Sequence, residues 1–435
     1  MKVPAQDTTN KSPRSEPPAS PLPESPPTSG MPLPHVELNG DKVLCPVCWL
    51  ESDSGELMHL AVHDSLRGDP VLGEDAQQRF LATRFDNSGN ALDALGLPCS
   101  EMACPKCRRK LPAGFLDVPH HIFSLVGDAR AGKSYFLSVL TKALPMSLFR
   151  QFGVTFQDAD PTGNAALNDM KKALFSAQTP GQAKLAKTQL EGAMYERLPR
   201  HGRMVALPKP FVYTLGANTG TGPRCSIILY DNAGEHFQPG LDVVEHPGAQ
   251  HVANAAGIMF LFDPFNTPEF RVHLADRKDP QLETAVVDQQ DVILAEMRTR
   301  IQNLRHLRLG ERISTPLAVI VGKCDAWLHL LGEHSVPSPL RSGWLDVGVL
   351  AHNSLRVRDL LLQLCPAVVA NAEALSTTVL YFPLSAFGHA PIKIGSGDYV
   401  PDPARLRPFM VEVPALWLLS HVCPELVPLR SAGET

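Results

Sequence analysis

The sequence contains a glycine-bounded loop of the kind that binds phosphate. Residues Gly127 to Ser134 are GDARAGKS and match G-x-x-x-x-G-K-[ST] at every fixed position. In such a loop the glycines let backbone N–H groups turn towards a phosphate, the lysine neutralises its charge, and the serine hydroxyl ligates Mg²⁺. An apolar run (HHIFSLV) precedes the loop and a helical pattern follows it, so the positive end of a helix would also face the anion. The residues expected to contact a nucleotide here are Gly127, Asp128, Ala129, Arg130, Ala131, Gly132, Lys133, Ser134 and Tyr135.

A second candidate element is an apolar run (CSIILY) that ends in D-x-x-G, formed by Asp231 and Gly234. A carboxylate at the end of a strand beside a phosphate loop can hold Mg²⁺, directly or through water. The Gly234 N–H can approach a γ-phosphate. Glu235 and His236 follow and, with Lys133, are the candidate catalytic residues, because either side chain could act on an attacking water. An ordinary charged turn is the alternative interpretation of Glu235 and His236.

Two shorter elements predict recognition of a guanine base. Lys323 and Asp325 follow the apolar run LAVIVG. The Asp325 carboxylate could accept hydrogen bonds from guanine N1–H and the exocyclic amine, whereas adenine N1 is itself an acceptor. The Lys323 stem could cover the base. Ser385 and Ala386 follow the last apolar run (VLYFPL) and could offer a backbone N–H to guanine O6.

These four elements, in this order, resemble the TRAFAC class of P-loop GTPases, which includes Ras-like proteins and translation factors. The resemblance covers about residues 115–425. It implies a mostly parallel sheet, GTP or GDP with Mg²⁺ as ligands, and hydrolysis coupled to a conformational switch. The paired cysteines, YDNAGE and RPFMVEVPALWLL are similar more narrowly to bacterial double-GTPase proteins. That likeness implies protein partners, a second GTPase among them, in a multi-component conflict system.

The chain departs from this family at two functional positions. Gly322 stands where the family usually has Asn or Thr, so a bond that ties the base loop to the phosphate loop is lost. Guanine selectivity should survive through Asp325. Glu235 stands where a Gln or His usually orients the attacking water, and a γ-phosphate repels a carboxylate. We therefore expect GTP hydrolysis by the isolated chain to be slow.

The stretch between the phosphate loop and Asp231 is much longer than in small Ras-like proteins. It contains helical patterns at 164–176 and 184–195. The family implies a threonine that ligates Mg²⁺ in this stretch, and Thr188 is the candidate, although it is remote from the next strand. A basic cluster could neutralise transition-state charge, with a solvated basic turn as the alternative. The cluster consists of Arg197, Arg200 and Arg203.

Two near-identical C-P-x-C motifs predict a metal site. The C-x-x-C spacing lets both thiolates reach one tetrahedral ion. The expected site is a closed, structural zinc site formed by Cys45, Cys48, Cys104 and Cys107. One alternative combines the first pair with His59 and His63 in a Cys₂His₂ set, and another is a redox dithiol.

The apolar pattern predicts the elements that position these residues. Apolar strands alternate with helical patterns from His120 onwards, which is typical of a mostly parallel sheet covered on both faces. The expected strands are 122–126, 211–215, 226–230, 258–262, 317–321 and 379–384, and the clearest helices are 287–304 and 414–422.

The fold class expected is α/β, a three-layer P-loop NTPase domain after a small zinc-ribbon-like module and a disordered tail. The expected parts are a Pro/Ser-rich tail at 1–34, a zinc-ribbon-like module with an insertion at 35–115, the P-loop GTPase-like domain at 116–425 and a flexible C-terminus at 426–435.

Composition restricts the class of protein. The 435 residues are 44% hydrophobic with a net charge of −5, which argues against a nucleic-acid partner. No apolar run is long enough to span a membrane and no leader pattern is present, so a cytoplasmic location is expected. Two alternatives to a slow GTPase remain. One is a scaffold that binds GTP without hydrolysing it, and the other is a nucleic-acid binder that uses the zinc module and is regulated by nucleotide.

Overall fold

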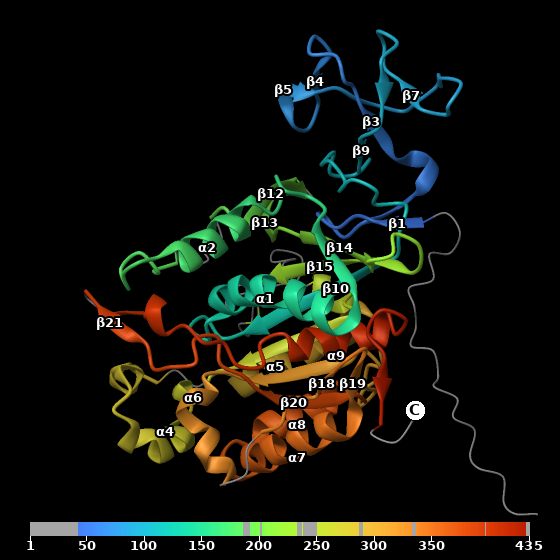
Figure 1. Cartoon of the computed structure of the whole chain (residues 1–435). Helices are drawn as coiled ribbons and strands as arrows, with labels where there is room; N and C mark the ends of the chain where they lie inside the picture. The colour runs from blue at the N-terminus through green and yellow to red at the C-terminus, as the bar shows by residue number, and fades with distance from the viewer. Residues whose placement is uncertain are drawn as a thin grey trace, which may run out of the picture. The chain divides into compact units, whose positions relative to one another are not determined.

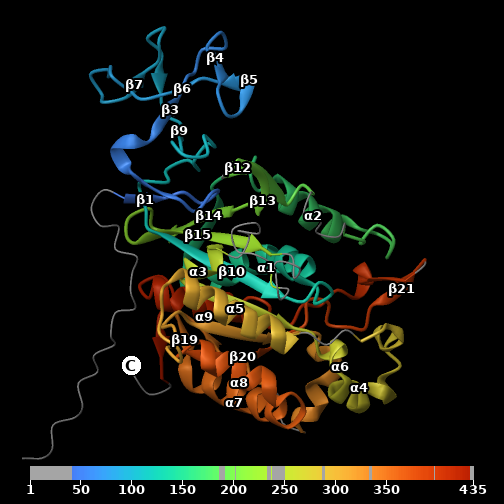
Figure 2. The same cartoon turned by 180° about the vertical axis from the view of Figure 1, so that it is seen from behind.

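A seven-stranded sheet forms the centre of the protein (Figures 1 and 2). The computed structural model describes residues 42–185, 192–200, 202–232, 237, 250–286, 290–332, 336–395 and 397–431. The strand order is β11-β14-β15-β10-β16-β17-β20. These strands are β10 (His120–Gly127), β11 (Val154–Asp158), β14 (Phe211–Ala217), β15 (Arg224–Asp231), β16 (Gly257–Phe262), β17 (Leu317–Val321) and β20 (Val379–Pro383).

The sheet is mostly parallel, as expected. Strands β15, β10, β16, β17 and β20 run parallel to one another; at one edge β14 pairs antiparallel with β15, and β11 pairs antiparallel with β14. Continuous apolar runs form the parallel strands because both faces of such a sheet are covered. All six expected strands are present; β17 has the expected bounds, and β16 begins one residue before the expected start.

Helices cover both faces of the sheet and make a three-layer α/β arrangement. Alternate residues of β10 point to opposite cores: Ile122 and Val126 belong to one, Phe123 and Leu125 to the other. The first core is completed by α3 (Gln250–Ala253), α4 (Pro268–Leu274), α5 (Gln290–Leu304), α6 (Cys324–Trp327), α7 (Val347–Leu364) and α8 (Pro366–Leu375). The second is completed by α1 (Lys133–Ser147), α2 (Ala165–Ser176) and α9 (Val413–Val422). The expected helix at 414–422 is confirmed, and α5 is the described part of the one at 287–304.

The N-terminal part of the described chain has only small sheets, and several of its buried side chains, such as Val43, Trp49 and Leu57, join the first core. We call residues 42–115 the knuckle module. Its strands are short antiparallel pieces, none longer than five residues, so their packing alone buries little apolar surface. They are β1 (Lys42–Leu44), β2 (Glu51–Asp53), β3 (Met58–Leu60), β4 (Arg67–Asp69), β5 (Gly73–Gln77), β6 (Arg79–Phe80), β7 (Ala91–Leu92), β8 (Pro98–Cys99) and β9 (Met102–Ala103).

Several elements differ from the sequence-based expectation. The helix expected at 184–195 is wrong in its described part, because a strand hairpin begins at Tyr195; residues 186–191 lie outside the described residues. The unexpected elements are β12 (Tyr195–Arg200), β13 (Arg203–Pro208), β18 (Leu340–Arg341), β19 (Trp344–Asp346), β21 (Ile392–Ile394), β22 (Asp398–Val400) and β23 (Leu429–Arg430).

The flexible C-terminus expected at 426–435 is also corrected in part. Leu426 and Val427 are buried in the second core, and β23 pairs in parallel with β19. These apolar side chains anchor the chain as far as β23. Residues 432–435, like the tail expected at 1–34, lie outside the described residues.

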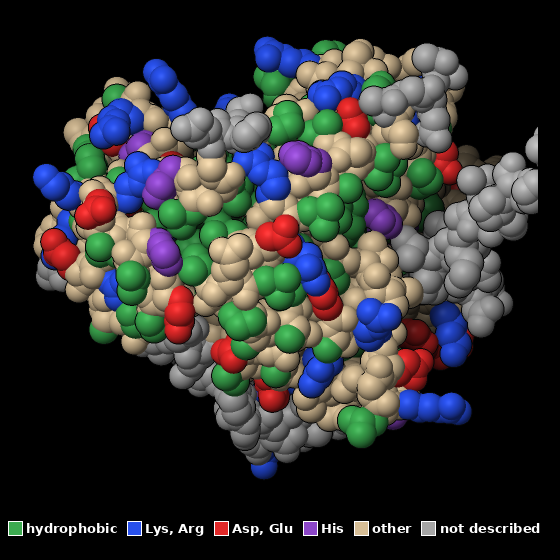
Figure 3. Space-filling view, turned by 90° about the horizontal axis from the view of Figure 1, so that it is seen from below, with side chains coloured by type: hydrophobic (Ala, Val, Ile, Leu, Met, Phe, Trp, Pro, Cys, Tyr) green, Lys and Arg blue, Asp and Glu red, His purple; other side chains and the backbone are tan. Residues whose placement is uncertain are grey.

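The surface carries charges of both signs. On the face shown in Figure 3, acidic and basic side chains are interspersed, and among the described residues neither sign gathers into a continuous patch there. Among the described helices, none combines the length and apolar character needed to span a bilayer.

Candidate functional site

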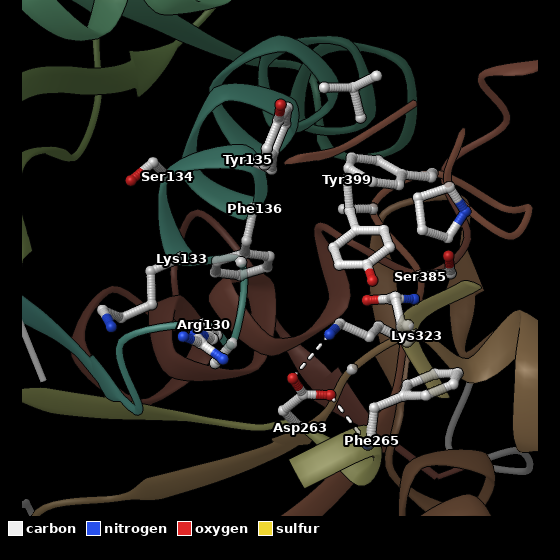
Figure 4. Close-up of a pocket in the computed structure, with 18 of the residues that line it drawn as sticks. Arg130, Lys133, Ser134, Tyr135, Phe136, Asp263, Phe265, Lys323, Ser385 and Tyr399 are labelled. Carbon is white, nitrogen blue, oxygen red and sulfur yellow. Dashed lines mark hydrogen bonds and ion pairs between the residues drawn. The ribbon is translucent and has the colours of Figure 1, made fainter. Parts of the chain in front are cut away.

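A cavity lies where the order of strand addition in the sheet reverses. The chain passes from β10 to β15 on one side and later to β16 on the other. In open α/β sheets, ligands bind at the carboxyl ends of the strands beside such a switch point. A cavity of about 1080 Å³ opens there, lined by the loop after β10 and by segments that follow β16, β17 and β20 (Figure 4).

The loop after β10 has the backbone of a phosphate-binding turn. Gly132 has a left-handed φ of 89°, which only glycine adopts without strain, and α1 begins at the next residue. The Lys133 Nζ donates to the carbonyl oxygens of Gly127 at 2.8 Å and Asp128 at 2.7 Å. The lysine is only 6% exposed, so its cation lies against the loop where an anion would be most stabilised.

Gly127 is required by close packing between two strands. A Cβ atom at this position would lie 2.5 Å from the Leu261 carbonyl oxygen of β16. Backbone on both sides cannot yield without disturbing the sheet. Gly127→Ala is therefore expected to lower the free energy of unfolding by about 1–3 kcal/mol, measured by urea denaturation. Gly181→Ala is the matched control, because its Cβ would meet nothing within 4 Å; equal stability of the two variants would contradict this account.

A pair of oxygen ligands stands beside the loop. The Ser134 hydroxyl donates to Asp231 Oδ2 at 3.0 Å, so the two predicted Mg²⁺ ligands are adjacent. Asp231 closes β15 and is only 1% exposed. A hydroxyl and a carboxylate are hard oxygen donors of the type Mg²⁺ prefers. The other predicted residues of this region, Gly234, Glu235, His236 and the candidate Thr188, lie outside the described residues.

The residues predicted to recognise a base meet at the other end of the cavity. Asp325 Oδ1 accepts a hydrogen bond from the Ser385 hydroxyl at 2.5 Å, and this hydroxyl accepts from the Gly388 N–H at 2.7 Å. The Ser385 N–H is used elsewhere, donating to the Phe409 carbonyl at 3.1 Å. Lys323 has a left-handed φ of 55° and its Nζ lies 2.7 Å from Asp263 Oδ2. Figure 4 shows Lys133 and Ser134 at one end and Lys323, Ser385 and Tyr399 at the other.

A tether that the sequence did not suggest joins the two ends. Asp263 and Asn266 follow β16; Asp263 pairs with Lys323, and the Asn266 amide donates to Asp128 in the phosphate loop. Gly322 cannot supply such a bond, and a Cβ there would lie 3.3 Å from the Phe262 carbonyl oxygen. The segment after β16 thus connects base loop and phosphate loop. In the sequence, this connection was indicated only by the run DPFN after an apolar strand.

The aromatic part of the cavity wall comes from three segments. The Tyr135 and Phe387 rings make an edge contact with centroids 5.0 Å apart, and Tyr399 of β22 also lines the cavity. Phe265 packs under the Lys323 ammonium, 5.3 Å from its ring centroid. Such rings offer flat apolar surface to a planar ligand.

The four predicted metal-binding cysteines converge in the knuckle module. Their Sγ atoms all lie within 4.8 Å of one another, with Cys45 to Cys107 and Cys48 to Cys104 both at 3.8 Å. A tetrahedron with Zn–S bonds of about 2.3 Å has edges of about 3.8 Å. The cluster is therefore compatible with zinc. Among the described residues His59 and His63 do not join it: His59 packs on Phe80 and His63 Nδ1 lies 2.8 Å from Ser65 Oγ.

The two knuckles have the same backbone. The Val47 N–H donates to Cys45 Sγ at 3.4 Å, and the Lys106 N–H donates to Cys104 Sγ at 3.3 Å. The residue after each second cysteine, Trp49 or Arg108, has a left-handed φ of 56° or 64°. Burial raises the pKa of the Cys45 thiol, because the thiolate would lose its hydration. A bound cation would offset that cost, as it does in thiolate metal sites.

The first knuckle is attached to the strand that carries Asp231. The Tyr230 hydroxyl donates to the Pro46 carbonyl at 2.5 Å and accepts from the Trp49 indole at 3.2 Å. The Tyr230 ring stacks on His251, whose Nδ1 lies 2.7 Å from the Ser124 hydroxyl on β10. All of these groups are buried. A chain of contacts thus runs from the cysteine cluster to the residue beside Asp231.

Comparisons with known proteins give the following similarities. No family model matches the chain. It is 27% identical over 199 residues to a protein of Mycolicibacterium smegmatis named as a candidate ESX-1 scaffolding and assembly protein, SaeC; the match covers 43% of this chain and 44% of that protein. The chain therefore spans less than half of that relative.

Two solved structures share low identity with the chain. Sup35 complexed with GDP is 12% identical, with a TM-score of 0.24, and the alignment covers 61% of this chain and 37% of Sup35. The translation elongation factor SelB of Methanococcus maripaludis, complexed with the GTP analogue GppNHp, is 10% identical, with a TM-score of 0.20, covering 61% of this chain and 30% of SelB.

Proposed function

We propose that this chain is a Mg²⁺-dependent guanine-nucleotide-binding protein of the P-loop GTPase type that acts as a slow conformational switch. The observation that carries the proposal is the convergence of the GDARAGKS loop and the Asp325–Ser385 pair around one cavity, with Asp231 held behind the loop by its hydrogen bond to Ser134. A phosphate chain would lie at the α1 end and a base at the Asp325 end. The volume of about 1080 Å³ suffices for a nucleotide.

At the phosphate end, each group has one role in the proposal. Lys133 would leave the loop carbonyls and bind the β- and γ-phosphates, while the loop N–H groups and the α1 dipole hold the phosphates. Ser134 would ligate Mg²⁺ and Asp231 would hold it directly or through water. Transfer of the γ-phosphoryl group to water would then depend on positioning and charge stabilisation. Glu235 and His236 remain the candidates for orienting that water.

At the base end, Asp325 would accept two hydrogen bonds from guanine and the Ala386 N–H would donate to O6. Asp325→Asn exchanges one carboxylate acceptor for an amide donor. The nucleotide preference of the variant chain is therefore expected to shift from GDP towards xanthosine diphosphate, whose base carries a carbonyl at C2. A change of about tenfold or more in relative affinity is expected from one reversed charged hydrogen bond. Competition of GDP, xanthosine diphosphate and ADP against a fluorescent nucleotide measures it. Equal affinity of the unmodified chain for ADP and GDP would overturn the base assignment.

The cysteine cluster has a structural role in this proposal. Four thiolates around one Zn²⁺ leave no position open for chemistry, so the ion would hold the knuckle module together. The ion pairs of its basic residues support this role over nucleic-acid binding: Arg108 pairs with Asp69 of the module at 3.1 Å and Arg109 with Glu196 of β12 at 2.5 Å.

A second candidate function is a nucleotide-gated scaffold that binds GTP and barely hydrolyses it. The similarity to SaeC favours it, since that relative is named for scaffolding and assembly. Glu235 in the position usually taken by Gln or His also favours it. Both candidate functions involve protein partners, and a second GTPase of a conflict system would be one such partner. GTP turnover measured against a Lys133→Ala control separates a GTPase from such a scaffold.

A further inference from the structure

A second cluster of metal-ligating side chains lies outside the cavity and the knuckle module. It consists of His121, Cys225 and Cys423. Their ligand atoms, two thiol sulfurs and a ring nitrogen, all lie within 4.8 Å of one another. Neither Cys225 nor Cys423 is in a disulfide, so both are available as ligands. We call the three residues the Cys₂His cluster.

Three different elements bring the Cys₂His cluster together. His121 is near the start of β10 and Cys225 near the start of the neighbouring strand β15. Both side chains lie on the face of the sheet that carries the second core. Phe123 and Ile227, two residues further along each strand, belong to that core. Cys423 ends α9, which covers this core. The cluster therefore lies at the opposite end of the parallel strands from the cavity, which begins after Gly127.

The backbone holds Cys423 in place. Its N–H donates to the Leu419 carbonyl at 2.7 Å, and its carbonyl accepts from the N–H groups of Leu426 at 3.0 Å and Val427 at 3.1 Å. Cys225 is 1% exposed and Cys423 is 6% exposed, whereas His121 is only partly buried. Two sulfurs and an imidazole thus meet at the edge of the apolar second core.

We propose that His121, Cys225 and Cys423 form a second Zn²⁺ site that fixes helix α9 to the sheet. Two thiolates and an imidazole are the ligand types that Zn²⁺ takes in proteins, at about 2.3 Å for sulfur and about 2.0 Å for nitrogen. The ligand spacing allows such bonds with small movements of side chains. Three protein ligands leave a fourth position for water, unlike the closed set in the knuckle module. Binding releases the thiol protons to solvent.

Metal counting on the full chain tests this proposal. The reduced chain is incubated with excess Zn²⁺, desalted, and its zinc content measured by mass spectrometry. About two ions per chain are expected, falling to about one in Cys423→Ser and to about one in His121→Gln. Cys365→Ser is the matched control, because it removes a buried thiol outside both clusters and should keep both ions.

Cobalt spectra identify the ligands of each ion. Co²⁺ in the chain is expected to show two sets of ligand-field bands, and His121→Gln should remove the set belonging to two sulfurs and one nitrogen while leaving the tetrathiolate set. Since His121 is partly buried, this variant is the one expected to stay folded if Cys423→Ser does not. One zinc ion per unmodified chain, with an unchanged count in His121→Gln, overturns the proposal. So does a Cys225–Cys423 disulfide in the mass of the unreduced chain. Neither result bears on nucleotide binding.

Discussion

Cys104→Ser is expected to lose the knuckle-module metal and to unfold that module. A structural zinc site in a small domain contributes about 10–16 kcal/mol of apparent binding free energy, and a hydroxyl is a poor substitute for a thiolate. The strands of the module are short and form sheets of two or three strands, so we expect their arrangement to depend on the ion. Amide hydrogen exchange across residues 42–115 and zinc content both report the loss.

The same substitution is expected to weaken nucleotide binding by about fivefold. The Pro46 carbonyl that accepts from Tyr230 lies between two cysteines, so loss of the ion frees the residue that precedes Asp231. Loss of one neutral hydrogen bond is worth about 1 kcal/mol. Tyr230→Phe should reproduce the weaker binding and retain the metal, because the ring can still stack on His251.

Cys99→Ser is the matched control for this experiment. Cys99 is a buried thiol of the same module, its Sγ donates to the Leu97 carbonyl at 3.5 Å, and it is outside the four-cysteine cluster. The variant should keep its zinc and its nucleotide affinity. Full zinc content in Cys104→Ser would show that the four cysteines do not share one ion.

Local patterns were sufficient to predict the central sheet. Strands β16 and β17 are uninterrupted apolar runs, which is typical of parallel strands covered on both faces. The C-P-x-C repeats likewise predicted that the two cysteine pairs meet at one site. The two knuckles share a left-handed residue after the second cysteine, and in each the residue two positions after the first cysteine donates its N–H to that cysteine's sulfur.

Contacts between distant segments could not be predicted in this way. Trp49 and Tyr230 are 181 positions apart, and nothing near either residue indicates its partner. Asp263 was overlooked because a carboxylate after a strand has many uses until Lys323 is placed beside it. The start of the β12 hairpin was mistaken for the end of a helix, because Tyr195 closes the helical pattern at 184–195 and its burial against the second core is not visible in the sequence.

Position along the chain also failed to predict order at the C-terminus. Residues 426–431 follow the last helix, and two prolines, Pro424 and Pro428, lie in or beside this segment. Leu426 and Val427 are nevertheless buried in the second core. A terminus becomes ordered when its apolar residues are buried. The Cys₂His cluster depends on the same anchoring, because Cys423 stands between α9 and this buried segment.

Lys133→Ala is expected to weaken binding of Mg²⁺·GTP by about 100-fold. Its ammonium is the one predicted to bind both the β- and γ-phosphates, and hydrogen bonds to charged groups contribute about 1.5–3 kcal/mol. The loop itself should keep its shape, because Gly127 packing and the Gly132 turn do not depend on the lysine side chain. Anisotropy of a fluorescent GTP analogue measures the affinity, and circular dichroism confirms the fold.

Lys142→Ala on the same helix is the matched control. Lys142 is exposed, and its ammonium lies 5.8 Å from the Phe175 ring centroid. Neither of these residues lines the cavity. Removing this charge changes the net charge of the chain equally, so any long-range electrostatic effect is shared by the two variants. An equal loss of affinity in both would mean that Lys133 makes no direct phosphate contact. If binding falls only in Lys133→Ala while phosphate release by the unmodified chain stays at the level of that variant, the protein binds GTP as a scaffold and the slow-GTPase proposal fails.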